Sequence, residues 1–170
     1  MFGMKHRRPP RLPDDSYIGP VRILFTMCTL DRRTSFVTRA VFELVHGQLV
    51  RTADDCAVEI IAHCFMPDHL HMLLAGLTES SDLEQCADLF RRRAGLAYRR
   101  LRREYLWQEG YFDQSLRETD ATFDVVCYIL ANPVRAGLCT RPSEYEFMGS
   151  SRYSIDDLLL SVQWRPDYMD

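Results

Sequence analysis

The chain has 170 residues, 46% of them hydrophobic, and a formal net charge of -3 at pH 7. A chain of this length and composition can bury one full hydrophobic core, which predicts a single folded domain. The net charge excludes a uniformly basic nucleic-acid binder, so any contact with nucleic acid must come from local clusters of Lys and Arg. No run of about 18 apolar residues, the length that a membrane-spanning helix needs, occurs in the sequence, and we expect no contact with a membrane.

Residues 1–16 are basic, contain several prolines and lack apolar periodicity. This composition predicts a flexible arm in front of a folded domain of residues 17–170. The positive charges of the arm are not followed by an apolar run, so the arm does not resemble a secretory signal. The 6 cysteines lack the short spacing of a structural zinc site, and thiols in a chain without a signal favour a reducing compartment. We therefore expect a cytoplasmic protein.

The first predicted strand covers residues 21–29, and the first predicted helix begins at Thr38. Two boundaries are compatible with the pattern that follows. After Gly47 the helix either gives way to a polar stretch or continues past Thr52, because later apolar residues also fit helical spacing.

A β-hairpin is predicted next, with two histidines at its opening. Residues 58–66 are rich in apolar and β-branched side chains and lead into Pro67-Asp68, a dipeptide that favours a turn. Side chains two apart in a strand point the same way. His69 and His71 therefore converge on one side of the second strand, while Leu70 points to the other side.

Two converging imidazoles are typical of an open metal site. Neutral imidazole binds transition metals, and two such ligands leave room for water and substrate in the coordination shell. The alternative interpretation is that His69 and His71 form the polar face of a half-exposed strand, and the two histidines alone do not decide between these interpretations.

A long helix is predicted from about Ser81 to Arg103, because residues 81–84 (SDLE) have the spacing of a capping box. An apolar stripe runs along it from Leu83 to Leu101, and the arginines largely face away from that stripe. Because few acids lie among these arginines, we expect them to form a phosphate-binding surface rather than an ordinary solvated helix face. The expected DNA contacts are Arg91, Arg92, Arg93, Arg99, Arg100 and Arg103.

A strand near residues 111–116 and a short helix over residues 120–131 complete the predicted core. Pro133 is expected to end this helix, because proline disfavours helical geometry in the residue before it. Tyr128 and Asn132 are four residues apart and share one helix face, with Asp124 one turn earlier. Taken alone, the tyrosine could anchor the helix and the asparagine could cap it.

The order of these elements predicts an α+β sandwich with a central antiparallel sheet. The region from Tyr145 to the end of the chain is compatible either with docking on the sheet or with contact to DNA.

Three sequence blocks, in this order, resemble the single-tyrosine HUH transposases of the IS200-like superfamily, and in particular their REP-associated branch. They are residues 63–74 (HCFMPDHLHMLL), 107–117 (WQEGYFDQSLR) and 128–138 (YILANPVRAGL). The first block carries the two histidines around a bulky apolar residue that define the HUH signature. One departure lies at Gln114, where relatives often carry a histidine.

This resemblance implies a ferredoxin-like fold and an enzyme that acts on single-stranded DNA beside a hairpin. It implies that Tyr128 is the nucleophile, that His69 and His71 hold a divalent metal, Mg or Mn, and that Asn132 is a candidate third ligand. It leaves open whether the chain acts as a monomer or a homodimer.

The chemistry of such a reaction has a physical requirement that the residues can meet. A phenol has a reference pKa of about 10 and attacks a phosphodiester poorly without help, whereas a metal can polarise the phosphoryl group and neutralise developing charge. The expected product is a 5′-phosphotyrosine, which conserves the bond energy for rejoining. The alternatives are a DNA-hairpin binding protein without chemistry and a metal phosphodiesterase that uses water.

Overall fold

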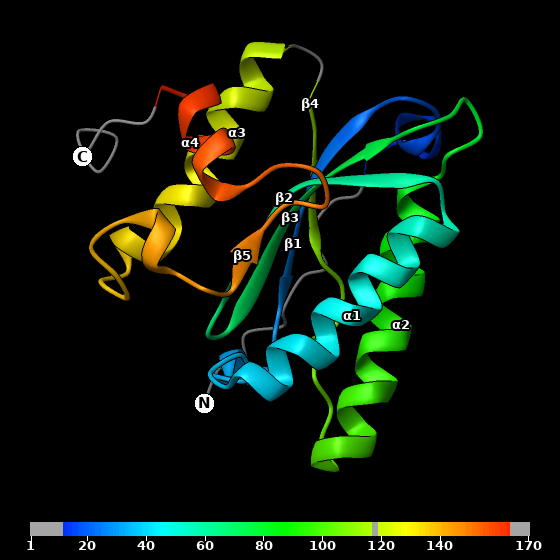
Figure 1. Ribbon diagram of the computed structural model, residues 1–170. Helices are drawn as coiled ribbons and strands as arrows, with labels where there is room; N and C mark the ends of the chain where they lie inside the picture. The colour runs from blue at the N-terminus through cyan, green and yellow to red at the C-terminus, as the bar shows by residue number, and fades with distance from the viewer. Residues whose placement is uncertain (1–11, 117–118, 164–170) are drawn as a thin grey trace, which may run out of the picture.

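The computed structural model describes residues 12–116 and 119–163, which form one antiparallel sheet covered by helices on both faces (Figure 1). The strand order is β4-β1-β3-β2-β5. The strands are β1 (Arg22–Cys28), β2 (Val58–Met66), β3 (His69–Gly76), β4 (Phe112–Leu116) and β5 (Met148–Gly149), and the α-helices are α1 (Arg39–Asp55), α2 (Leu83–Arg102), α3 (Thr119–Arg135) and α4 (Ile155–Ser161).

The chain order β1-α1-β2-β3-α2-β4 with an antiparallel sheet is that of a ferredoxin-like fold. The predicted α+β sandwich is therefore confirmed. The predicted hairpin is present as β2 and β3, joined by the tight turn at Pro67 and Asp68, and β3 is the middle strand of the sheet. The two histidines thus lie on the most enclosed strand.

The two faces of the sheet carry separate apolar clusters. Leu70, Met72 and Leu74 of β3 pack with α1 and α2 in the larger cluster. Leu73 faces the other way and packs with α3 and α4 in a smaller cluster. Because alternate side chains of a strand point to opposite faces, His69 and His71 lie on the same face as Leu73, which α3 covers.

The helices on the larger face differ from the predicted ones at their boundaries. Helix α1 continues through Gly47 to Asp55, which settles the open boundary. The capping box predicted at Ser81 is wrong, because Asp82 is the N-cap of α2 and accepts from the Gln85 amide. Ser81 instead donates its hydroxyl to the carbonyl of Ala57. Leu101, predicted in the buried stripe, is exposed.

Helix α3 does not stop before Pro133, as predicted, but runs through it to Arg135. A proline removes one helical hydrogen bond, yet the amide of Ala136 still donates to the carbonyl of Asn132 at 3.0 Å. The chain leaves the helical direction only at Gly137, which has a φ of +70°. The burial of Ile129 and Leu130 against the sheet holds this last turn in place.

The two ends of the described chain are both tied to the sheet. Residues 1–11 of the predicted arm lie outside the described residues, but Leu12 packs against the larger cluster and residues 14–17 form a short 3-10 helix. The folded part therefore begins before residue 17. At the other end, β5 pairs with β2, so this region docks on the sheet. Among the described residues, no helix is long and apolar enough to cross a bilayer.

A close backbone approach at the end of β3 generates a stability prediction. A methyl group on Gly76 would collide with the carbonyl of Gly19, whereas a methyl group on Gly47, inside α1, would meet nothing within 4 Å. We expect Gly76→Ala to lower the free energy of unfolding by about 1–3 kcal/mol, and Gly47→Ala to raise it by roughly 0.5–1 kcal/mol. Urea denaturation followed by circular dichroism measures both, and equal effects of the two substitutions would contradict the packing at Gly76.

Candidate active site and metal centre

Two imidazole rings of β3 meet on the face of the sheet that α3 covers. The Nε2 atoms of His69 and His71 lie 3.1 Å apart, and their ring centroids are separated by 4.7 Å. The convergence that the strand alternation predicts is therefore present. Both Nε2 atoms can therefore approach one common point in front of the strand.

The other nitrogen of each ring is held by a neighbour. Nδ1 of His69 lies 2.7 Å from Asp68 Oδ1, and Nδ1 of His71 lies 2.8 Å from the Thr26 hydroxyl of β1. A carboxylate only accepts, so Nδ1 of His69 donates and its Nε2 carries the lone pair. Asp68 is in turn held by Arg32, whose Nε lies 2.9 Å from Oδ2. Such partners orient imidazoles for metal binding.

Burial keeps both imidazoles neutral at neutral pH. It lowers the pKa of His71 to about 3, and the neighbouring His69 and Arg32 side chains lower it further because they disfavour a second positive charge. Burial also lowers the pKa of His69, against the opposing effect of the Asp68 carboxylate. Neutral imidazole is the form that binds metal, so both side chains are ready to act as ligands without losing a proton.

The donor set fits an open metal site and not a closed structural one. Among residues 12–116 and 119–163, no group of three or more His, Cys, Asp and Glu side chains could hold a metal ion. A metal on the two histidines would therefore complete its shell with oxygen ligands from an amide, water or a phosphate. Such a shell leaves positions for a substrate.

Tyr128 of α3 reaches this histidine pair. Its ring lies edge-on to the ring of His71, with 5.2 Å between the centroids and 71° between the planes. The side chain is 41% exposed, so the phenol is open to solvent while its ring contacts the site. Val126, Ile129 and Leu130 hold the helix against the sheet, which places the tyrosine over β3.

The structure places Asn132 one turn after Tyr128, on the predicted face, but its amide is turned to its own helix. The amide nitrogen donates to the Tyr128 carbonyl at 2.7 Å. This bond uses the nitrogen and leaves the amide oxygen out of that contact. Asp124 and Phe123, one turn earlier on this helix, are both exposed.

Sequence reasoning missed two residues that support the histidines, Thr26 and Arg32. Thr26 is the register partner of His71 in β1, and nothing near it in the sequence signals this role. The register could have suggested it only after the β1–β3 pairing was known. On its other edge, Thr26 pairs with Phe112 of β4. Gln114 of β4 pairs instead with Leu24, two residues before Thr26 in β1.

The predicted DNA-contact arginines lie on α2 and, for Arg103, at its C-cap. Helix α2 covers the opposite face of the sheet from α3, which carries Tyr128 (Figure 1). Three of them contact other protein groups: Arg91 donates to the Gln108 carbonyl, Arg93 pairs with Asp55 at 2.6 Å, and Arg99 lies over the Tyr105 ring. Within the described residues, the side chains of the other three make no hydrogen bond or ion pair, and they are available to phosphate. They are Arg92, Arg100 and Arg103.

Comparison with known proteins agrees with this geometry. Residues 21–132 match the family model described as "Transposase IS200 like". A REP-associated tyrosine transposase of Escherichia coli K12 is 24% identical over 159 residues, which cover 91% of this chain and 90% of the relative. A solved structure of a REP-associated tyrosine transposase bound to a REP hairpin superposes with a TM-score of 0.76 at 22% identity, covering 96% of this chain and 94% of the other. The resemblance carried by the three sequence blocks is therefore confirmed.

The hydrogen bond between Thr26 and His71 gives a prediction for metal binding. Thr26→Val removes the hydroxyl at nearly constant volume, so His71 loses the partner that orients its ring, and we expect about tenfold weaker binding of Mn²⁺. Thr26→Ser keeps the hydroxyl and is expected to bind Mn²⁺ as the unsubstituted protein does. Isothermal titration calorimetry measures the affinities, and a Thr26→Val affinity equal to that of Thr26→Ser would remove Thr26 from the site.

Proposed function

The chain belongs to the IS200-like transposase family, and we propose that it cleaves and rejoins single-stranded DNA beside a hairpin, with Tyr128 as the nucleophile. The observation that carries this proposal is the contact between the Tyr128 and His71 rings, with centroids 5.2 Å apart. A nucleophile from α3 and two metal-binding imidazoles from β3 are the parts that a tyrosine strand transferase needs. The relative whose structure contains a REP hairpin supports a hairpin as the substrate.

In the proposed reaction the Tyr128 oxygen forms a bond to phosphorus and the bond from phosphorus to the 3′-oxygen breaks. The phenol proton is lost and the leaving 3′-oxygen gains a proton, so one fragment ends in a 3′-hydroxyl and the other in a 5′-phosphotyrosine. The exposure of Tyr128 allows a DNA strand to reach the phenol from solvent. Rejoining reverses these steps without an external energy source, because one phosphodiester replaces another.

We propose that His69 and His71 hold Mg²⁺ or Mn²⁺, with Asn132 as a candidate oxygen ligand. When bound, the ion would polarise a non-bridging phosphate oxygen and offset the charge that develops on it. The chain's own residues prepare this site: Asp68 and Thr26 hold the Nδ1 atoms, which would leave both Nε2 atoms to face the position of the ion. Asn132 would need to turn its amide oxygen toward that position.

A single copy of the chain suffices to bring these groups together. Tyr128 and His71 contact each other within one chain, so a second subunit is not needed to supply the nucleophile. We therefore propose that a monomer forms the site.

The proposed nucleophile gives a prediction for the covalent intermediate. Tyr128→Phe removes the attacking oxygen and keeps the ring contact with His71, so it is expected to form no covalent adduct with a labelled single-stranded hairpin in the presence of Mn²⁺, while its hairpin affinity stays within about twofold. Denaturing gel electrophoresis detects the adduct. Tyr105→Phe, which removes a hydroxyl from another exposed tyrosine, serves as the matched control.

Three other outcomes would argue against this mechanism. An undiminished adduct with Tyr128→Phe would remove Tyr128 from the reaction. Cleavage without an adduct in the unsubstituted protein would favour a phosphodiesterase that uses water. Retention of the hairpin in native gels without any cleavage would favour a binding protein.

The exposed arginines of α2 give a prediction for the salt dependence of binding. If Arg92 and Arg100 contact phosphates, the double substitution to Ala should weaken hairpin binding and reduce the slope of log affinity against log salt by up to about 2, because each lost phosphate contact releases about one counterion fewer. Fluorescence anisotropy over a range of salt concentrations measures this slope. Arg51→Ala, which removes one charge from the exposed face of α1, is the control for the single substitutions Arg92→Ala and Arg100→Ala, measured beside the double variant. An unchanged slope in the double variant would show that these two arginines contact no phosphate and only form a solvated helix face.

A further inference from the structure

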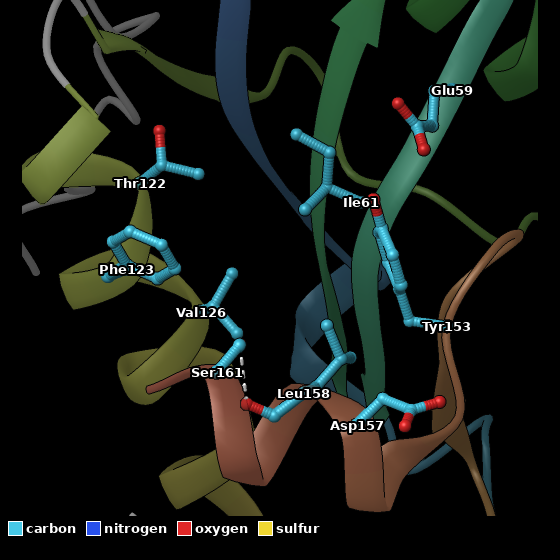
Figure 2. A pocket seen from close by; sticks show the side chains of 9 residues that line it. All are labelled: Glu59, Ile61, Thr122, Phe123, Val126, Tyr153, Asp157, Leu158 and Ser161. Carbon is cyan, nitrogen blue, oxygen red and sulfur yellow. Dashed lines mark hydrogen bonds between the residues drawn. The ribbon is translucent and has the colours of Figure 1, made fainter. Parts of the chain in front are cut away.

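A cavity of about 310 Å³ opens between β2, α3, α4 and the segment that precedes α4 (Figure 2). Its lining includes Glu59 and Ile61 from the strand, Phe123 and Val126 from α3, and Tyr153 beside α4. The volume lies at the small end of the range for ligand sites, which is roughly 300–1,000 Å³. It suits one planar group of the size of a nucleobase.

A β-bulge turns Glu59 into this cavity. Glu59 pairs with Ala75 and Ala62 pairs with Leu73, so three steps along β2 match two steps along β3. The extra residue, Ile61, shifts the alternation of the strand. Without it, Glu59 would point to the opposite face from Ala62 and Cys64. The bulge therefore places a carboxylate on the same face of the sheet as His71 and Tyr128.

The carboxylate of Glu59 lacks a strong partner. Its Oε1 is buried and makes no hydrogen bond within the described residues, and its ion pair with Arg152 is long, at 3.7 Å. The Glu59 side chain is only 18% exposed. A buried carboxylate is unfavourable unless it accepts hydrogen bonds. The second acid of the cavity, Asp157, already accepts from Ser154, so Glu59 is the acceptor left for a ligand.

The wall that carries Tyr153 is anchored to the bulge. The hydroxyls of Ser150 and Ser151 both donate to the Ile60 carbonyl at 3.1 Å. Tyr153 and, across the cavity, Phe123 are exposed aromatic rings. Aromatic side chains of this kind stack on unpaired bases, and Arg152, itself exposed beside Glu59, is placed to contact a backbone phosphate.

We propose that this cavity binds one unpaired base of the DNA strand that flanks the hairpin, and that Glu59 selects a base with adjacent N–H donors, of which guanine is the best match. A carboxylate only accepts, and the ring N–H and amino group of guanine offer it two parallel donors. Thymine offers one donor between two carbonyl oxygens, which the carboxylate repels.

The position of the cavity agrees with such a role, which rests on the proposed function. Phe123 and Val126 lie on the same helix as Tyr128. Ala75, the partner of Glu59 on β3, is four residues from His71, which corresponds to roughly 13 Å at about 3.3 Å per residue along the strand. A single strand could therefore pass from the cavity to the nucleophile along one face of the sheet.

The test uses hairpin probes whose single-stranded flank is all thymine except for one guanine at successive positions. Fluorescence anisotropy without divalent metal measures binding without cleavage. We expect one position at which guanine tightens binding about tenfold, consistent with a good bidentate base contact. Glu59→Gln should abolish this preference, and Tyr153→Ala should weaken binding of either base there about tenfold. Asp156→Asn, on the exposed side of α4, should keep the full preference.

Four results would overturn the cavity's assignment. The first is the absence of a guanine preference at every flank position, and the second is an unchanged preference in Glu59→Gln. The third is an equal loss of affinity in Glu59→Gln for all probes, including a hairpin without a flank. The fourth is tighter binding of free dGMP than of the guanine-bearing flank. Circular dichroism confirms that each variant is folded.

Adduct formation with Mn²⁺, measured on the same proteins, separates this proposal from the proposed function. If the unsubstituted protein shows the guanine preference but forms no adduct, the base site is supported and the strand-transfer mechanism is refuted. If it forms the adduct while Glu59→Gln keeps the guanine preference, the mechanism is supported and the base site is refuted.

Discussion

The antiparallel pairing of β3 with β1 on one edge and β2 on the other is the constraint on which the candidate site depends. Because both edges of β3 are bonded, its register cannot slip without breaking two ladders of hydrogen bonds. A slip by one residue would turn His69 and His71 into the apolar cluster under α1 and α2 and expose Leu70. The same register brings the Thr26 hydroxyl to His71, so the pairing both chooses the face of the histidines and orients one of them.

The two faces of the sheet have different roles, since one supplies most of the apolar packing and the other carries the candidate site. The face under α1 and α2 holds the larger apolar cluster and supplies most of the buried side chains. The face under α3 and α4 has a smaller apolar cluster and places polar side chains between sheet and helix. Because those polar groups are partly buried, their partners matter: Asp68 and Thr26 orient the histidines, and burial lowers the pKa of both imidazoles so that they stay neutral.

Helix α3 connects the two proposed binding regions of that face. One turn of the helix carries Tyr128 over the histidines, and an earlier turn carries Phe123 and Val126 at the cavity that Glu59 lines. The bulge at Ile61 and the continuation of α3 through Pro133 are both departures from regular geometry. The first turns a carboxylate toward the helix, and the second keeps Asn132 within the helix, one turn from Tyr128. Packing of Ile129 and Leu130 against the sheet makes the second departure tolerable.

By itself the sequence determined the features that depend on local periodicity: the hairpin turn at Pro67 and Asp68, the common side of His69 and His71, and a helix that carries Tyr128. These follow from the two-residue repeat of strands and the turn propensity of short segments. Only the tertiary structure decided which residues meet across elements. Thr26 and Arg32 support the histidines from more than 35 positions away in the chain, Ser81 serves Ala57 instead of capping α2, and Glu59 faces α3 only because of a bulge. Register, bulges and packing arise between segments distant in the chain, and therefore local sequence patterns do not specify them.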